Sequence, residues 1–314
     1  MRAWVGITDS AWFTFLASLG RLEEVNFWQP GGTRRFRGLD PGELFLFKLH
    51  SPRNFIVGGG VFAHATLVPL SLAWESFGPR NGAASQEQMK AQIERYRGRS
   101  GQASGDFTIG CSLITQPFFL PEHQWIPVPN DWPRSTMQGK SYALDREPGL
   151  SLYLRLRDAL GRNFVESHGV VGTQDADEPS VDRYGSPTMM TPRLGQGAFR
   201  ILVTDAYERR CAITGERVLT VLDAAHIRPF SADGEHRVDN GLLLRSDLHK
   251  LFDRGYLTVA PDLRIEVSRR IHEEFNNGKV YYALLGQQIR TPGLNANRPS
   301  LAQLRWHNEN VYLG

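Results

Sequence analysis

Hydrophobic and polar residues follow two different periods along the chain, one typical of strands and one typical of helices. Short runs rich in apolar, β-branched and aromatic residues indicate strands. In the first half of the chain these runs cover residues 3–9, 43–51, 54–70 and 107–120. A turn that contains Pro52 joins the second run to the third. The pattern therefore predicts a β-rich N-terminal region.

Other segments place apolar residues on one face at helical spacing. The clearest covers residues 85–99, where Met89, Ile93 and Tyr96 lie near one face among charged residues. Further helices are predicted over residues 10–20, 70–78, 151–161, 193–210 and 300–314. Helices therefore flank the strands in the first half of the chain and recur in the second half.

Two segments lack both periods. Residues 25–43 are rich in Gly, Pro and Arg and are predicted to form a loop. Residues 166–192, rich in Gly, Ser, Pro and acidic side chains, are typical of a linker. A chain of 314 residues is long enough for two domains. We therefore expect domains at 1–165 and 193–314, joined by this linker.

Composition narrows the class of protein. Hydrophobic residues make up 41% and charged residues 22% of the chain, as in ordinary globular proteins. A net charge of +3 and a pI of about 8.9 are compatible with a nucleic-acid partner. Cys111 and Cys211 indicate a reducing compartment, and a zinc site of four cysteines is excluded. His272 and His307 belong to no motif and are expected at the surface.

Several sequence signals are missing. The chain contains no GxxxxGK[ST] motif, so ATP is not expected. It has no apolar stretch of membrane-spanning length and no signal-peptide pattern at its start. We therefore expect a bacterial cytoplasmic protein that does not bind a membrane.

Residues suited to phosphodiester hydrolysis occur together between Cys211 and Tyr256. Asn240 follows His226 by fourteen residues, and His249 follows Asn240 by nine. A neutral imidazole can take a proton from water near pH 7, and a divalent metal can stabilise charge on the phosphate.

The local pattern places these residues on a compact frame. It predicts a strand over residues 219–227, a turn at 239–241 and a helix over 242–252. On that helix His249 and Asp253 are four residues apart, so both can hold one ion.

The segments AAHIRP, DNGLLL and HKLFDRG, in this order, resemble the His-Asn-His (HNH) nuclease motif. The resemblance implies a ββα-metal domain in which His226 is the general base and His249 binds the metal. It assigns Asn240 to tying the loop together and orienting the base, and Asp253 to a second helical ligand.

The chain departs from the family pattern at one metal position. Many members carry Asp or His directly before the base, where this chain has Ala225. Asp223 is the remaining candidate, although strand alternation points it away from His226. The identity of this ligand stays open.

A further resemblance concerns residues 193–200, which are similar to the Arg-x-Gly-Gln-x-x-Phe-Arg run found ahead of this HNH type. Arg193, Gln196 and Arg200 are candidates for DNA phosphate contacts. A solvated helix face is an equally open interpretation of these residues.

Residues 42–60, GELFLFKLHSPRNFIVGGG, resemble the paired strands of PUA-like barrels of the EVE branch, which are related to SRA domains. The match covers roughly residues 1–160. It implies an N-terminal β-barrel that holds a flipped or single-stranded modified base in an aromatic pocket. The expected fold is thus α+β, with a PUA-like (EVE/SRA-like) β-barrel followed by a ββα-metal HNH nuclease domain.

A flipped base needs aromatic rings to stack on and polar groups to read its edge. The candidates for this pocket are Asn26, Phe27, Trp28, Gln29, Ser51 and Trp74. The candidates for contacts with the DNA backbone are Arg34, Arg35, Arg37 and Lys48. Trp28 stands in a Gly/Pro-rich loop, which favours function, whereas Trp74 is equally consistent with core packing. Trp4 and Trp12 are expected in the core.

Together these features predict a modification-dependent DNA endonuclease of the restriction type. It would bind 5-hydroxymethylcytosine or 5-methylcytosine in double-stranded DNA and cut the backbone with Mg2+, Mn2+ or Ni2+. Symmetric cutting of both strands takes two active sites, so a homodimer is expected. Two alternatives stay open: a nuclease for RNA or structured DNA, and a modified-base reader without catalysis.

Overall fold

The computed structural model describes residues 1–97, 105–133, 135–168 and 189–314. Contacts divide the chain into two compact units, unit 1 at Met1–Arg193 and unit 2 at Leu194–Gly314. The division falls beside residue 193, where the sequence predicts the start of the second domain. Most of the predicted linker, residues 166–192, lies outside the described residues.

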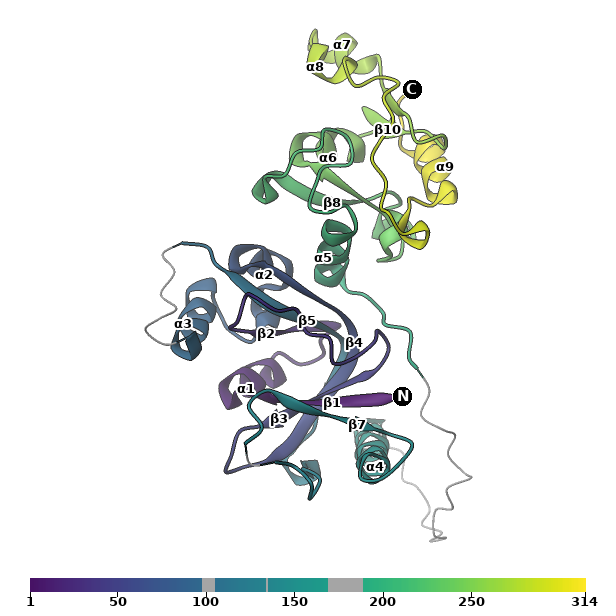
Figure 1. Cartoon of the computed structure of the whole chain (residues 1–314). Coiled ribbons are helices and arrows are strands. Elements are labelled where there is room, and N and C mark those ends of the chain that lie inside the picture. The colour runs from purple at the N-terminus through teal and green to yellow at the C-terminus, as the bar shows by residue number, and fades with distance from the viewer. Residues whose placement is uncertain (98–104, 134, 169–188) are drawn as a thin grey trace. The chain divides into compact units, whose positions relative to one another are not determined.

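Unit 1 is built on a seven-stranded sheet (Figure 1). The strands are β1 (Arg2–Thr8), β2 (Glu24–Gln29), β3 (Leu44–Leu49), β4 (Phe55–Pro69), β5 (Thr108–Phe119), β6 (Ile126–Pro127) and β7 (Gly139–Ala143). They follow the order β2-β5-β4-β3-β1-β7, and β6 pairs with β4. β1 runs parallel to β3, whereas the other described pairings in this sheet are antiparallel.

The central strand β3 is buried on both sides, which explains its continuous apolar run. Phe45 and Phe47 point into a core that includes α1 (Ser10–Ser18). Leu46, between them, points into a second core that includes α4 (Gly149–His168). Strand alternation thus covers the two faces of the sheet with different helices.

Two more helices complete unit 1, α2 (Leu70–Phe77) and α3 (Gln86–Arg97). Met89 and Ile93 of α3 are fully buried, as their spacing predicts. Tyr96 is 45% exposed and lies at the edge of that apolar face. The strands and helices predicted for this unit are therefore confirmed, whereas strands β2, β6 and β7 were not predicted.

Two expectations for unit 1 are wrong. Residues 24–29 form β2 and not the start of a loop, because they pair with residues 110–115 of β5. Their polar and Gly/Pro-rich surroundings concealed this strand. The sheet is also open, since its outer strands β2 and β7 are not paired with each other in the described part. The α+β class is confirmed, but a closed barrel is not formed by these strands.

Unit 2 begins with α5 (Gln196–Ala206), which packs against a β-hairpin followed by a helix. The hairpin consists of β8 (Leu222–His226) and β9 (Gly241–Arg245), and the helix is α6 (Ser246–Asp253). Leu242, Leu243, Leu244, Leu248 and Phe252 are fully buried in one core. The hairpin followed by a helix is the shape that the resemblance implies. Residues 242–245, predicted as the start of the helix, form strand β9 instead, because they pair with residues 222–225 of β8.

The remainder of unit 2 extends this core. It contains β10 (Leu257–Val259), β11 (Ile265–Val267), α7 (Arg270–Phe275), α8 (Lys279–Tyr282) and α9 (Leu301–Asn310). Short 3-10 helices occur in both units. Those of unit 1 are Gly78–Asn81 and Glu122–Gln124, and those of unit 2 are Leu219–Val221, Phe230–Ala232, Val238–Asn240 and Asn295–Asn297. None of the helices in the described ranges combines the length and apolarity of a membrane span.

His307 corrects a further expectation, because it is buried at 2% exposure and not at the surface. Its ring stacks on Phe252 at a centroid distance of 3.8 Å. Nδ1 lies 2.8 Å from the Thr258 hydroxyl, and Nε2 lies 3.1 Å from the Phe252 carbonyl oxygen. Burial lowers the pKa of His307 to about 4, so the ring is neutral near pH 7. His272, by contrast, is exposed as expected.

Candidate functional site

The hairpin and α6 bring the residues of the HNH-like segment together. In the hairpin, His226 stands opposite Gly241, at the C-terminal end of β8 beside the loop that connects the two strands. In α6, Leu248 and Phe252 are buried in the core, while His249 and Asp253 follow each of them by one residue. This offset leaves His249 and Asp253 partly accessible on the adjoining face of the helix.

His226 lies at the contact between β8 and α5. Its ring stacks on Phe199 at a centroid distance of 3.9 Å and an interplanar angle of 12°. Burial lowers the pKa of His226 to about 4, and the neighbouring imidazoles of His236 and His249 act in the same direction. The ring is therefore neutral near pH 7, which is the form that can accept a proton.

Asn240 holds together the loop that joins the two strands. It is 1% exposed, and its Nδ2 donates to the carbonyl oxygens of Arg228 at 3.0 Å and Glu235 at 2.9 Å. Its Oδ1 accepts from the Arg228 backbone N–H at 2.9 Å. One buried amide thus fixes the loop at two separate points, in keeping with the tying role that the resemblance implies.

His249 lies between two carboxylates. Its Nδ1 is 3.6 Å from Oδ2 of Asp223, and its Nε2 is 3.3 Å from Oδ2 of Asp253. Burial raises the pKa of Asp253, the nearby His249 opposes this shift, and the negative charge of Asp223 adds to it. The cluster therefore concentrates negative charge around one imidazole.

The position of Asp223 follows from strand alternation. Asp223 and Ala225 lie on one side of β8, and Ala225 is fully buried in the core. The alternation that turns Asp223 away from His226 turns it toward α6, where it meets His249. A ligand is thus available at position 223, although none is available at 225.

An imidazole and two carboxylates are donors that suit a divalent ion such as Mg2+, Mn2+ or Ni2+. Asp223 and Asp253 approach opposite nitrogens of His249, so the three side chains do not converge on one point. Within the described ranges, no group of three or more His, Cys, Asp or Glu side chains is arranged to hold a metal ion. The chemical types of these side chains suit a divalent ion. In this arrangement His249 can share an ion with one of the two carboxylates at a time.

Two further candidates for phosphate contacts, Gln196 and Arg200, lie in the first turns of α5, and a third, Arg193, is the last residue of unit 1. Arg193 and Gln196 are exposed, and Arg200 is half-buried. Exposure leaves Arg193 and Gln196 accessible to a phosphate, and their role stays a prediction.

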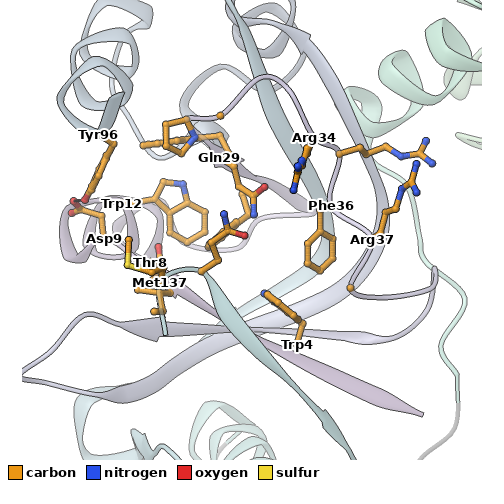
Figure 2. A pocket seen from close by; sticks show the side chains of 18 of the residues that line it. Trp4, Thr8, Asp9, Trp12, Gln29, Arg34, Phe36, Arg37, Tyr96 and Met137 are labelled. Carbon is orange, nitrogen blue, oxygen red and sulfur yellow. Dashed lines mark hydrogen bonds between the residues drawn. The ribbon is translucent and has the colours of Figure 1, made fainter. Parts of the chain in front are cut away.

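Unit 1 contains a cavity of about 730 Å³ (Figure 2). Six aromatic side chains contribute to its lining: Trp4, Trp12, Phe27, Trp28, Phe36 and Tyr96. Three cationic side chains, Arg34, Arg35 and Arg37, come from the segment between β2 and β3. We call this cavity the aromatic pocket. It joins flat apolar surfaces to a cationic segment, a combination suited to a base and its phosphates.

An acidic residue and a tyrosine meet on one side of the pocket, as Figure 2 shows. Asp9 accepts from the backbone N–H of Ala11 at 2.7 Å and thereby caps α1. The Tyr96 hydroxyl, from α3, donates to the same carboxylate. Burial and this bond raise the pKa of Tyr96 to about 12, so the hydroxyl stays protonated. The contact connects α1 to α3 beside the pocket.

Three of the residues predicted to bind a base lie at this cavity, and their role stays a prediction. Phe27, Trp28 and Gln29 line the aromatic pocket. Trp28 donates its Nε1–H to the Asn81 carbonyl oxygen at 2.9 Å, which fixes the ring. Phe27 is 7% exposed and belongs to the core as well.

Four predicted positions are not placed to meet a ligand in this pocket. Asn26 is fully buried and bonds to Asn81 and Cys111. Ser51 and Trp74 are not part of the lining. Lys48 is 2% exposed, because it alternates to the opposite face from Phe45 and Phe47.

The Lys48 side chain is satisfied inside unit 1. Its Nζ donates to the Leu49 carbonyl oxygen at 2.9 Å and to Oδ1 of Asn54 at 2.8 Å. A buried ammonium with these bonds does not reach a DNA phosphate, so that prediction is wrong.

Sequence reasoning missed other parts of both sites. Trp4 and Trp12, expected in the core, line the pocket, and Asp9 and Tyr96 also contribute. In unit 2 it missed His236, whose Nδ1 lies 2.9 Å from Nε2 of His226. The available signal was a second histidine inside the loop between the base and Asn240.

Comparisons with known proteins agree with the geometry of unit 2. Residues 211–260 match the family model described as HNH endonuclease. No curated protein matches the chain. The family match covers both strands of the hairpin and α6, so unit 2 contains an HNH endonuclease domain and the protein is a nuclease.

Two solved structures are similar to parts of the chain. A structure titled modification dependent TagI restriction endonuclease is 14% identical, with 92% of this chain and 75% of the other covered and a TM-score of 0.30. A mutant of the ZmASCH protein from Zymomonas mobilis is 12% identical, with 49% and 95% covered and a TM-score of 0.29. TM-scores this low establish no common fold.

Proposed function

We propose that the protein is a metal-dependent DNA endonuclease whose cutting depends on a modified base. The observation that carries this proposal is the arrangement within the HNH endonuclease match. A neutral His226 stands at the end of the hairpin, and His249 lies between Asp223 and Asp253 on α6.

The proposed reaction is hydrolysis of a phosphodiester in DNA. His226 accepts a proton from water, the water oxygen bonds to phosphorus, and the bond from phosphorus to the leaving oxygen breaks. The leaving oxygen takes a proton from solvent. Asn240 keeps the loop beside His226 in place through its three hydrogen bonds to Arg228 and Glu235.

His249, together with either Asp253 or Asp223, would hold a divalent ion, Mg2+, Mn2+ or Ni2+. Such an ion, when bound, supplies positive charge to the phosphate and to the leaving oxygen. Burial raises the pKa of Asp253, and the negative charge of Asp223 adds to this shift. A cation offsets this charge, which is why the cluster favours one.

Unit 1 would select the substrate. A flipped base takes a few kcal/mol to unstack, and stacking on aromatic rings returns about 1–3 kcal/mol per base. The walls of the aromatic pocket offer such rings, and Gln29 and Asp9 offer polar groups for a base edge. Arg34, Arg35 and Arg37, which line the same pocket, would contact the flanking phosphates. We propose 5-hydroxymethylcytosine or 5-methylcytosine in double-stranded DNA as the ligand, bound by a PUA-like domain with an open sheet.

Cutting both strands of a duplex takes two active sites, and each chain has one HNH endonuclease segment. A homodimer in the bacterial cytoplasm supplies both. The dimer stays a prediction that the mass of the protein in solution, free and with DNA, would test.

The test is cleavage of one plasmid sequence in four forms: unmodified, 5-methylcytosine, 5-hydroxymethylcytosine and glucosylated 5-hydroxymethylcytosine. Each form is incubated with Mg2+ or Mn2+, and with EDTA as the control. We expect cutting that needs the metal and is confined to modified forms. Equal cutting of all forms would remove the selective role of unit 1. Cutting of RNA alone, or DNA binding without cutting of any nucleic acid, would overturn the proposed function.

A further inference from the structure

A second histidine contacts the proposed general base. His236 lies on the loop between β8 and β9, and its Nδ1 is 2.9 Å from Nε2 of His226. The ring of His236 stacks on Phe230, with centroids 5.0 Å apart and an interplanar angle of 7°. The ring of His226 stacks on Phe199 in the same manner. An aromatic neighbour thus orients each imidazole, and the two rings meet through these nitrogens.

When both imidazoles are neutral, the hydrogen bond between them contains one proton, and two arrangements are possible. If His236 donates, His226 carries its own proton on Nδ1. Its Nε2 lone pair is then engaged as well, and His226 has no free site for the proton of a water. If His226 donates from Nε2, its Nδ1 keeps a free lone pair. The second arrangement is therefore the one in which His226 can act as a base.

We infer that His236 is a positioning residue that accepts the Nε2–H of His226 and thereby leaves Nδ1 of His226 free to take the proton from the attacking water. This inference rests on the proposed hydrolysis, and it assigns the reacting nitrogen of the base. The relation is that of a base and its orienting partner in a hydrolytic triad, with a neutral imidazole in place of the carboxylate.

The buried amide of Asn240 explains how His236 reaches this position. Asn240 donates to the carbonyl oxygen of Glu235, the residue directly before His236. It also bonds to both backbone groups of Arg228, two residues after His226. The segment between His226 and His236 separates the two imidazoles along the chain. The Asn240 amide bonds to Arg228 near one end of this segment and to Glu235 near the other. The middle residue of the motif acts on the base through the loop that carries His236.

The proton balance during the reaction is simple. His226 takes the water proton on Nδ1 and becomes an imidazolium, while its Nε2–H stays bonded to Nδ1 of His236. The lone pair of His236 then faces a positive charge, so the bond strengthens as the proton arrives. An interaction that grows during the reaction lowers its barrier and affects kcat more than KM.

The direct test reads the protonated nitrogen in the wild-type protein. Nitrogen-15 NMR of the histidine rings in the full-length protein reads which nitrogen carries the proton, and His226→Ala assigns the signals of His226. The spectra are taken near pH 7, without metal and with Mg2+. We expect His226 to be protonated on Nε2 and unprotonated on Nδ1 in both. A proton on Nδ1 of His226, or an unprotonated Nε2, overturns the inference.

Matched variants give the kinetic test. His236→Leu keeps the size of the side chain and removes the acceptor, whereas His236→Asn keeps an acceptor oxygen close to the position of Nδ1. With the modified plasmid as substrate, we expect His236→Leu to lower kcat by about 100-fold, with KM within about twofold. His236→Asn should recover most of this loss. His272→Leu, at an exposed histidine of the same unit, is the control and should cut like the wild type.

The two failures are distinguishable. If the wild type cuts no DNA, the proposed function fails, and the NMR result still decides the hydrogen bond. If the wild type cuts and His236→Leu matches its kcat, the inference fails while the nuclease stands. Equal losses in His236→Leu and His236→Asn also overturn it, because a role in packing alone predicts that outcome.

Discussion

The nuclease site of unit 2 and the aromatic pocket of unit 1 are assembled in different ways. The nuclease site takes its residues from a single stretch between Asp223 and Asp253, folded as a hairpin and a helix. The pocket takes its residues from positions as far apart as Trp4 and Gln138. One site depends on local hydrogen bonds, whereas the other depends on the packing of a whole sheet.

Under the proposed function, this difference separates the residues that hydrolyse DNA from those that select it. In unit 2 the side chains that matter are polar, few and held by specific bonds, such as those of Asn240. In unit 1 several large aromatic rings line the pocket together. Some of them, such as Trp12 and Phe27, also belong to the hydrophobic core. A single substitution should therefore abolish the reaction in unit 2 but only reduce selectivity in unit 1.

The largest effect is expected for His226→Ala. Loss of a general base lowers the rate of cutting by about 10²- to 10⁴-fold, because water is then deprotonated by solvent alone. Binding of modified DNA, measured by gel shift or fluorescence anisotropy, should stay within about twofold of the wild type, since the pocket lies in unit 1. Cutting within tenfold of the wild type would assign the base to another residue.

The next effect concerns how the free energy of unfolding depends on pH, which should differ between the two units. The folded His307 has a pKa of about 4 against an ordinary value of 6.5. The unfolded chain therefore takes up a proton below about pH 6.5, whereas the folded chain does so only near pH 4. Between these values His307 alone lowers the stability of unit 2 by about 2–3 kcal/mol as the pH falls, or roughly 10 °C in Tm. The lowered pKa of His226 acts in the same direction, so only the part of the shift that His307→Gln removes belongs to His307.

Unit 1 should respond at lower pH. The pKa values of Asp9 and Glu43 are lowered in the folded state by hydrogen bonds that oppose the effect of burial. Their stabilisation is present above the ordinary carboxyl pKa and is lost only as the pH falls further. Calorimetry at pH 7 and pH 4.5 measures this contrast, with His307→Gln as the control. A Tm shift that is equal in wild type and His307→Gln contradicts the assignment.

The smallest effect is expected in the pocket. Trp28→Ala removes one stacking surface, worth about 1–3 kcal/mol, so the ratio of modified to unmodified DNA cut should fall by roughly tenfold. Trp74→Ala is the matched control, because Trp74 is half-buried in the same unit and does not line the pocket. Equal rate losses on modified and unmodified DNA would instead indicate that Trp28 serves only the core.

The contrast between the sites also explains what the sequence predicts well. The order of His226, Asn240 and His249 and the i, i+4 spacing of Asp253 place their frame correctly, because each relation is local. The role of His236 was not predicted, because its contact with His226 depends on how the loop between β8 and β9 bends. The burial of His307 was not predicted for a similar reason, because its partners Thr258 and Phe252 are about fifty residues away in the sequence.

The pocket shows where local reasoning fails. The Gly/Pro-rich residues after Gln29 suggested a loop, but residues 24–29 are a strand because β5 offers an edge to pair with. Hydrophobic pattern alone assigned Trp4 and Trp12 to the core and does not show that one side of each ring borders a cavity. Lys48 was misassigned because its face of β3 depends on alternation within a fully buried strand.

Residues 30–38 leave the sheet after β2 and form one side of the aromatic pocket before the chain returns as β3. None of them belongs to a helix or a strand. Segments of this kind accept substitutions and insertions more readily than the strands that flank them. A lineage can therefore alter which ligand the pocket accepts by changing one short run of codons, while the sheet and the hydrolytic unit are inherited intact.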